Sequence, residues 1–246
     1  MIRAVTFDCW GTLLLDGPAS DDRYKHQRLT AIQSILAASG VSTAPRELVR
    51  AYLESGRRLG RIWARRRDVP VAEHVRGLLE SLDAELPDRL PSRVMAGLVE
   101  AYAQPALRVP PKIDEGARGA LEELAGRGLA LALVSNTMRT PGAVFRRIFD
   151  EAGLLAPFKV LTFSDECGIR KPDPEIFLLT LRQIGVAPGE AVHVGDDPVL
   201  DVEGARDAGM SVIQVTADGR ATGPAKPDAV ITRLDHLPAA LAGLGA

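Results

Sequence analysis

The sequence predicts an α/β fold, in which an open, doubly wound and mostly parallel sheet carries helices on both faces. Short runs of residues that are apolar on both faces recur six times along the chain, and such runs are typical of buried parallel strands. Helix-like stretches lie between them, as in a doubly wound sheet. One long stretch, residues 16–106, has no convincing strand and predicts an inserted bundle of helices.

The first predicted strand covers residues 2–7. Amphipathic segments separated by glycine and prolines follow it and predict the inserted helices, at residues 22–38, 45–66, 71–82 and 91–102. The other predicted strands are residues 130–134, 160–163, 191–194, 212–215 and 229–231. We therefore predict a core domain of residues 1–15 and 107–246 and a helical domain of residues 16–106.

The predicted core helices carry recognisable end signals. In residues 115–128, apolar residues recur at three- and four-residue spacing before a glycine. For residues 174–184, Asp173 is a suitable N-cap and Pro174 suits the first helical position. The helix predicted at residues 199–208 is followed by glycine, which commonly ends helices.

Length and composition narrow the classes of function. The 246 residues carry 30 basic and 32 acidic side chains, and the resulting charge of −2 gives no electrostatic reason to expect nucleic acid as a partner. No apolar run approaches the roughly 18 residues of a membrane span. The N-terminus turns acidic before a signal peptide could form, and two cysteines cannot build a disulfide framework. We expect a cytoplasmic enzyme that acts on small molecules, as a monomer or homodimer.

The net charge of −2 is the sum of a positively charged part and a negatively charged part of the chain. Residues 16–110 hold 15 Lys and Arg against 12 Asp and Glu, which gives +3, so the rest of the chain holds 15 against 20, which gives −5. We expect a cation and a small anionic substrate to meet between these two parts.

Polar side chains follow the predicted strands at the edge where open α/β sheets bind ligands. Asp8 closes the first strand, Gly11 permits a sharp turn that brings N–H groups near an anion, and Thr12 offers a hydroxyl. Ser135 and Asn136 follow the next core strand. Taken singly, Asp8 is also an ordinary helix cap, and Ser-Asn is ordinary turn chemistry.

Two further strand ends carry charge. Lys171 stands just before a predicted helix, while Asp196 and Asp197 follow a strand, with Asp201 five residues beyond Asp196. Three carboxylates at one strand end repel one another unless a cation lies among them. With Asp8, the set suits displacement through an aspartyl intermediate, in which Lys171 and Mg²⁺ neutralise the developing charge.

Four segments at these strand ends resemble the motifs of the haloacid dehalogenase-like hydrolase superfamily, and the resemblance extends over the whole chain. They are FDCWGTLL (residues 7–14), LVSNT (133–137), GIRKPDPEIF (168–177) and VGDDPVLDVEGARDAG (194–209). The resemblance implies a Rossmann-like core, a mobile helical cap of the C1 type found in subfamily I, and hydrolysis by an aspartate nucleophile.

The resemblance also implies a role for each motif residue. Asp8 is the implied nucleophile, and Asp201 is expected to orient Lys171 or a water. The residues implied to act in catalysis are Asp8, Ser135, Lys171 and Asp201. Those implied to bind substrate are Trp10, Gly11, Thr12 and Asn136. The implied Mg²⁺ ligands are Asp8, Asp196 and the backbone carbonyl of Trp10.

The sequence departs from the phosphatase pattern at Trp10. Phosphatases of the superfamily carry there a second Asp, which protonates the leaving group and later activates water. Indole has one N–H and no proton that titrates near neutral pH, so it cannot act as a general acid or base. The substitution threatens proton transfer more than metal binding, and it places a bulky ring at the mouth of the site.

Three activities remain open at this point. The 2-haloacid dehalogenases of the superfamily also carry an aromatic residue at this position and need no acid, because halide leaves unprotonated. They place a Tyr where Phe177 stands and a Ser where this chain keeps Asp196. The intact acidic motif therefore favours a Mg²⁺-dependent phosphatase over a metal-independent dehalogenase. A catalytically impaired binding or regulatory protein is the third possibility.

An arginine-rich segment in the predicted cap has two interpretations. Residues 57–67 hold six arginines and Trp63. Such a run is usually a solvated helix face. Alternatively, one of these arginines reaches the core and binds an anionic group of the substrate.

Two residues near the motifs are interpreted as packing residues. His193 lies inside a predicted strand, where a hydrogen-bonded core histidine is expected. Alternation along the strand end points Cys9 away from Asp8.

Overall fold

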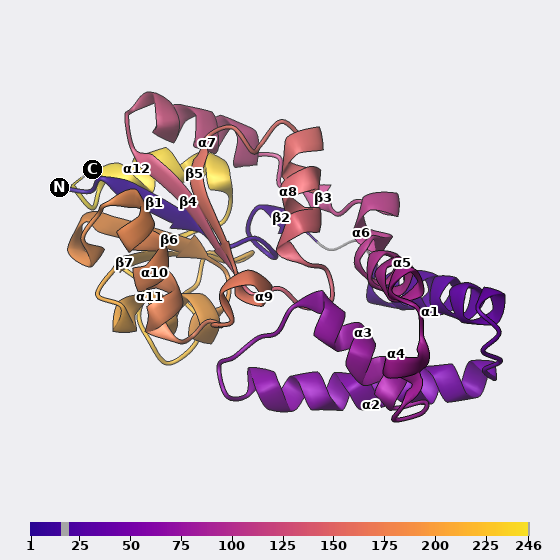
Figure 1. The fold of residues 1–246 in the computed structure, drawn as a ribbon. Coiled ribbons are helices and arrows are strands. Elements are labelled where there is room, and N and C mark those ends of the chain that lie inside the picture. The colour runs from indigo at the N-terminus through magenta and orange to yellow at the C-terminus, as the bar shows by residue number, and fades with distance from the viewer. Residues whose placement is uncertain (16–19, 246) are drawn as a thin grey trace.

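The computed structural model describes residues 1–15 and 20–245, so the predicted start of the helical domain at residue 16 lies outside the described residues. Six strands form one parallel sheet in the order β5-β4-β1-β6-β7-β8. The sheet and its helices form one lobe, and a group of helices projects from it on the side opposite the N-terminus (Figure 1). The predicted α/β fold is confirmed.

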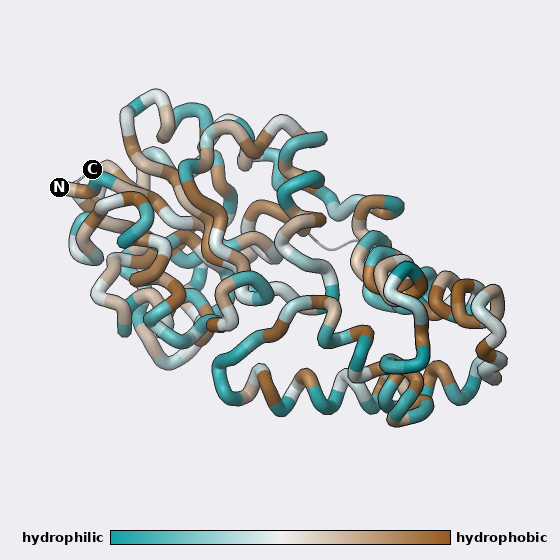
Figure 2. The backbone as a smooth tube through the Cα atoms, in the orientation of Figure 1, coloured by the Kyte–Doolittle hydropathy of each residue, from teal (hydrophilic) through white to brown (hydrophobic). Residues whose placement is uncertain are grey.

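Each strand coincides with one of the six predicted apolar runs. The central strands are buried along their whole length, which explains why both of their faces are apolar. In Figure 2 the strands are accordingly coloured mostly as hydrophobic. The strands are β1 (Ala4–Phe7), β4 (Ala130–Ser135), β5 (Phe158–Phe163), β6 (Ala191–Gly195), β7 (Ser211–Val215) and β8 (Ala229–Ile231).

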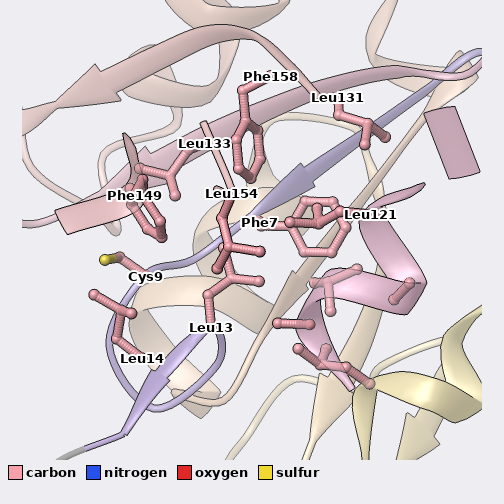
Figure 3. Close-up of a cluster of buried hydrophobic side chains, with 14 of the residues drawn as sticks. Phe7, Cys9, Leu13, Leu14, Leu121, Leu131, Leu133, Phe149, Leu154 and Phe158 are labelled. Atoms are coloured by element: carbon pink, nitrogen blue, oxygen red, sulfur yellow. The ribbon is translucent and has the colours of Figure 1, made fainter. Parts of the chain in front are cut away.

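Helices cover both faces of the sheet. On one face, apolar side chains of α7 (Ala117–Gly126), α8 (Gly142–Glu151) and α12 (Leu237–Ala242) join the largest buried cluster, part of which is drawn in Figure 3. On the other face, α10 (Pro174–Ile184) and α11 (Gly204–Asp207) contribute to a second cluster. Cys9 lies fully buried in the first cluster, in agreement with its predicted packing role.

The projecting helices, residues 20–108, are called the helical lobe below. They are α1 (Ser20–Ala38), α2 (Pro45–Trp63), α3 (Val71–Glu80), α4 (Leu86–Arg89), α5 (Ser92–Ala103) and α6 (Pro105–Arg108). The lobe has a hydrophobic cluster of its own, to which α1, α2, α3 and α5 contribute fully buried or nearly buried side chains. It therefore packs as a separate layer. The domain boundaries at residues 16 and 106 stay a prediction.

The strand register places the carboxyl ends of the central strands side by side. Phe7 in β1 lies opposite Leu133 in β4 and opposite Val194 in β6. The residues that follow these three positions therefore share one edge of the sheet, and this edge faces the helical lobe (Figure 1).

Several short elements differ from the prediction. A two-stranded antiparallel ribbon joins β2 (Leu14–Leu15) and β3 (Lys112–Ile113), and each strand is too short to show an apolar period. The helix predicted at residues 199–208 is divided into a π-helix, η2 (Pro198–Glu203), and α11. The helices α4, α6, α8, α9 (Ser164–Cys167) and α12 and the 3₁₀ turns η1 (Pro188–Glu190) and η3 (Leu234–His236) were not predicted.

Among the described residues, no helix combines the length and apolar character needed to cross a membrane.

Candidate active site

A cavity of about 600 Å³ lies between the sheet edge and the helical lobe. Six of the predicted site residues line it on the sheet side. On the opposite side it is lined by residues of α1 and α2. The predicted residues that line it are Asp8, Trp10, Asn136, Lys171, Asp196 and Asp201. The structure thus brings together strand ends that lie up to 190 residues apart in the sequence.

Lys171 joins two carboxylates at the floor of this cavity. Its Nζ donates to Asp8 Oδ1 and, at 2.6 Å, to Asp201 Oδ1, and all three residues are buried. Burial disfavours the lysine charge, but the adjacent carboxylates of Asp201 and Asp8 outweigh it and raise the pKa of Lys171 above its ordinary value. Lys171 is therefore a fixed cation beside Asp8.

The two carboxylates respond differently to their surroundings. Burial raises the pKa of Asp8 to about 7, against the opposing charge of Lys171. Burial also acts on Asp201, but Lys171 and a hydrogen bond from His193 outweigh it and lower the pKa of Asp201. Asp201 is thus the fixed counter-ion of Lys171, as its predicted orienting role requires.

Asp201, which bonds Lys171, lies in the π-helix η2. Its wider turn gives Asp201 and Val202 the same backbone acceptor, the carbonyl of Asp197, each at 3.1 Å. The Asp201 carboxylate in turn accepts from the Asp197 N–H at 3.0 Å and from His193 Nε2 at 3.1 Å. The helix predicted at residues 199–208 thus begins as a π-helix at the residue that bonds Lys171, and such turns are frequent at functional sites.

His193 is the hydrogen-bonded core histidine that the sequence predicts. The ring is fully buried and bonds Thr6 Oγ1 through Nδ1 at 2.8 Å and Asp201 through Nε2. Burial lowers its pKa, despite the charge of Asp201.

Asp196 completes a carboxylate cluster. Oxygen atoms of Asp8, Asp196 and Asp201 lie within 4.8 Å of one another, a grouping that suits a cation. Burial first, and then the charge of Asp201, raise the pKa of Asp196 to about 6. Gly11 makes the close approach possible, because it has a φ of +79° and a Cβ there would lie 2.4 Å from Asp196 Oδ2.

Two buried hydroxyls of the predicted site, which do not line the cavity, lack a hydrogen-bond partner among the described residues. Thr12 Oγ1 and Ser135 Oγ are buried, and neither has a hydrogen-bond partner within the described part of the chain. Buried polar atoms of this kind normally have one. They fit a site that completes its hydrogen bonds with an oxyanion.

Asn136 holds the segment that carries Lys171. Its Oδ1 accepts from the Lys171 N–H at 2.8 Å, and its Nδ2 donates to the Lys171 carbonyl at 3.0 Å. The second N–H of the amide remains for a ligand in the cavity, which Asn136 also lines.

Trp10 forms part of the cavity wall beside Asp8. It is half-buried, and its ring contacts Phe145 edge-on, with 5.7 Å between centroids. The position at which the superfamily's phosphatases carry an acid therefore presents an aromatic surface to the ligand.

The six arginines of residues 57–67 do not line the cavity, although Trp63 of the same segment does. All six of its arginines are exposed, and among them Arg58 pairs with Glu80 and Arg67 with Asp173 at 2.7 Å. A solvated face fits this segment. The cations that do line the helical side of the cavity are Lys25 and Arg28 from α1, with Arg139 from the loop after β4.

Arg28 had a signal in the sequence that we did not use. Tyr24, Arg28, Ile32 and Leu36 recur every four residues and are all buried, so Arg28 stands on the apolar stripe of α1. A charged residue on such a stripe indicates a buried polar contact. Arg139 had no comparable signal, because it lies in a loop.

A buried ion pair joins the two lobes next to Lys171. Asp68, whose side chain is fully buried, accepts from Arg170 at 2.6 Å, from Ser164 at 2.5 Å and from Trp63 Nε1 at 2.9 Å. Arg170 also lies 4.6 Å from the Trp63 ring centroid, and both line the cavity. Sequence reasoning missed this contact because its partners are about 100 residues apart.

Comparison with known proteins agrees with this geometry. Residues 2–209 match the sequence profile described as haloacid dehalogenase-like hydrolase, so the chain belongs to this family of hydrolases. A phosphoserine phosphatase of Thermus thermophilus is 41% identical over 132 residues, which cover 53% of this chain and only 51% of the relative. Phosphoglycolate phosphatase 1 of Pseudomonas aeruginosa is 29% identical over 97% of this chain and 79% of its own.

A solved structure shares the whole fold. The 2-haloacid dehalogenase of Pseudomonas syringae pv. Tomato DC3000 superposes with a TM-score of 0.73 at 27% identity, over 99% of this chain and all of its own. Phosphatases and a dehalogenase thus stand side by side among the proteins that this chain resembles.

Proposed function

We propose that this hydrolase is a Mg²⁺-dependent phosphatase that acts on a small phosphorylated metabolite, with Asp8 as the nucleophile. The observation that carries the proposal is the cluster of Asp8, Asp196 and Asp201 around a single cation, Lys171. A phosphate dianion cannot enter such a site without a further positive charge. The phosphatases among its relatives support the same activity.

The donor set of the site fits Mg²⁺. Asp8, Asp196 and the backbone carbonyl of Trp10 would hold the ion, and oxygen ligands are those it prefers. When bound, it would polarise the phosphoryl oxygens and offset the charge of the incoming phosphate.

The chain's own residues then perform the transfer. A carboxylate oxygen of Asp8 attacks phosphorus, and the P–O bond to the alcohol breaks, so that the phosphoryl group is carried by Asp8. Lys171 and the hydroxyls of Thr12 and Ser135 stabilise the charge that develops on the phosphoryl oxygens. Attack of water at phosphorus releases phosphate and restores Asp8. We propose that the helical lobe acts as a cap that excludes bulk water during transfer.

Trp10 shapes which substrates react. No acid stands at this position, so the departing alkoxide leaves without a proton from this residue. Good leaving groups are therefore hydrolysed preferentially.

The second candidate is the metal-independent hydrolysis of a carbon–halogen bond in a 2-haloacid. Trp10 favours it, because halide needs no proton, and so does the overlap with a dehalogenase structure. The position at which those enzymes place a Tyr opposes it. Phe177 is fully buried, stacks edge-on against His193 at 4.9 Å and does not line the cavity. Asp196, which those enzymes replace by Ser, also remains.

One experiment separates the candidates. Phosphate release and chloride release are measured side by side, over panels of phosphate monoesters and 2-chloroacids, with Mg²⁺ and with EDTA. We expect phosphate release that EDTA abolishes. Chloride release that EDTA leaves unchanged would establish the dehalogenase instead, and silence in both panels would favour a binding protein that has lost turnover.

A further inference from the structure

Arg28 and Arg139 both line the helical side of the cavity. Within the described residues, neither Arg28 nor Arg139 forms an ion pair, in contrast to Lys171, which contacts two carboxylates. Asp21 and Asp22 line the cavity too, but both are exposed and neither pairs with these arginines. Two arginines on this part of the wall therefore have no carboxylate partner among the described residues.

Arg28 is the more deeply buried of the two, with only 4% of its surface exposed. Its guanidinium has five N–H donors. Nε donates to the Tyr102 carbonyl at 2.8 Å, and Nη2 donates to Thr140 Oγ1 at 3.2 Å. Both acceptors are neutral, and three donors remain at the cavity wall. A buried charge without a counter-ion is destabilising, so such an arrangement is expected where a ligand supplies the anion.

Arg139 approaches the same place from the opposite lobe. Its Cζ lies 4.0 Å from the centroid of the Tyr52 ring, and Nη1 donates to the Tyr102 hydroxyl at 2.5 Å. Gly56 leaves room for it, because a Cβ there would lie 2.5 Å from Nη2. Stacking on a tyrosine fixes the plane of the guanidinium while leaving most of its donors available.

Both arginines contact Tyr102. Arg28 binds its carbonyl and lies 5.3 Å from its ring centroid, while Arg139 binds its hydroxyl. One arginine comes from α1 and the other from the loop that follows Ser135 and Asn136. The pair therefore exists only when the two lobes are in contact. Both guanidinium groups line the cavity, and guanidinium groups suit a carboxylate or a phosphate, which accept bidentate hydrogen bonds.

We propose that Arg28 and Arg139 form a second anion-binding subsite, and that the substrate is a phosphate monoester bearing a second anionic group, a carboxylate or a further phosphate. The proposal rests on the proposed function, since it places the reacting phosphate at Asp8 and the second anion at the arginines. Lys25, half-buried on the same wall, adds positive charge at its edge.

Binding of phosphonates tests the subsite without turnover, because their P–C bond is not hydrolysed. Isothermal titration of the whole protein with Mg²⁺ compares methylphosphonate with 3-phosphonopropionate and with propane-1,3-diphosphonate. We expect at least one of the two probes with an anionic tail to bind about tenfold tighter or more than methylphosphonate. Tighter binding of 3-phosphonopropionate indicates a carboxylate as the second anionic group, and tighter binding of propane-1,3-diphosphonate indicates a phosphate. Equal affinity for all three probes overturns the proposal.

Variants assign the gain to the two arginines. Arg28→Gln and Arg139→Gln are each expected to remove most of the increase in affinity over methylphosphonate. Arg139→Lys is expected to retain part of this increase. The matched control is Arg61→Gln, an exposed arginine of α2 that does not line the cavity and should keep the full gain. A gain that survives both Arg28→Gln and Arg139→Gln places the second anion elsewhere and contradicts the assignment. Circular dichroism of each variant confirms that it is folded.

Hydrolysis distinguishes this proposal from the proposed function. We compare kcat/KM for alkyl phosphates that carry a carboxylate with kcat/KM for alkyl phosphates whose alkyl group is uncharged. This ratio is expected to exceed about ten in the wild type and to fall in Arg139→Gln, mainly through KM. If the wild type hydrolyses phosphate esters but this kcat/KM ratio is near one, the proposed subsite is contradicted and the proposed phosphatase activity stands. If the phosphonates with an anionic tail bind tightly and depend on the arginines, but no phosphate ester is hydrolysed, the subsite is supported and the phosphatase activity is contradicted.

Discussion

The two sides of the cavity are built on opposite electrostatic principles. On the sheet side, Lys171 bonds Asp8 and Asp201, and Asp201 also bonds His193, whereas the Asp196 carboxylate forms no ion pair among the described residues. On the helical side, Arg28 and Arg139 contact neutral oxygens and aromatic rings. The sheet side is thus held in place before a ligand arrives, whereas the helical side needs one to balance its charge.

This difference separates reaction from recognition. Groups that must keep one geometry through the chemistry gain from internal partners, because these fix their positions. Groups that select a substrate must leave hydrogen-bonding capacity unused until it binds. The predictions below disturb one side or the other, in order of decreasing expected effect.

The largest effect is expected at Asp8. Asp8→Asn removes the nucleophile but keeps the size of the side chain, so hydrolysis should fall by about 10⁴-fold or more. Phosphate release at saturating substrate measures it. The control is Asp173→Asn, which alters an ion pair on the outer surface of the Lys171 segment. Activity of Asp8→Asn close to that of the wild type would remove the nucleophile assignment.

The missing acid at Trp10 predicts a steep dependence on the leaving group. Aryl phosphates should react faster than alkyl phosphates by about 10²–10⁴-fold, which is the usual contribution of general acid catalysis. Trp10→Asp should reduce this difference by accelerating the alkyl phosphates. The measurement is kcat for a series of phosphates of graded leaving-group pKa. A flat series in the wild type would show that another group supplies the proton.

The contact between the lobes gives the next largest effect. Asp68→Asn leaves Arg170 buried beside a neutral amide and should lower the free energy of unfolding by about 3–5 kcal/mol. Arg67→Ala breaks an exposed ion pair at the same junction and should cost less than about 1 kcal/mol. Urea denaturation measures both variants. Equal losses would mean that the buried network does not hold the lobes together.

The smallest predicted effect concerns pH and lies away from the chemistry. His74 in α3 is buried, and burial first lowers its pKa to about 4, against the opposing charge of Asp68. The unfolded chain, with an ordinary histidine pKa, binds the proton more readily, so stability is complete above about pH 6.5 and decreases as pH falls toward 4. Between pH 7 and 5 this amounts to about 2 kcal/mol.

The loss between pH 7 and 5 should shrink in His74→Phe and persist in His26→Gln, which alters an exposed histidine. Urea denaturation at the two pH values compares them. An equal loss in His74→Phe and in the wild type would exclude His74 as its source.

The sheet side could be predicted from sequence because strand ends are local features. Asp8, Ser135 and Asp196 each follow an apolar run directly, and parallel strands must bring their ends to one edge. The apolar runs predicted the six strands, and the shared edge of a parallel sheet predicted that the residues after these strands lie together. The π-turn that contains Asp201 could not be predicted in this way, because it depends on hydrogen bonds that form only within the folded site.

The helical side resisted prediction for a physical reason. Arg139 gains its role from Tyr52 and Tyr102, which lie 37 or more positions away in the sequence and on other elements. Density of charge is a poor guide in such a case. The segment with six arginines is solvated, while a single arginine on the apolar stripe of α1 reaches the cavity. The position of an arginine on the apolar face of a helix therefore indicates a binding role better than the number of arginines in a segment.

The most direct test of the central claim follows oxygen through one turnover. The wild-type enzyme is given a stoichiometric amount of the best substrate from the panels in H₂¹⁸O, and the peptide that contains Asp8 and the released product are both analysed by mass spectrometry. Attack of water at the phosphorus of a phosphorylated Asp8 predicts ¹⁸O in the phosphate and none in Asp8. Label in the carboxyl group of Asp8 would mean that water attacks an ester carbonyl, as in carbon–halogen hydrolysis, and would contradict the account.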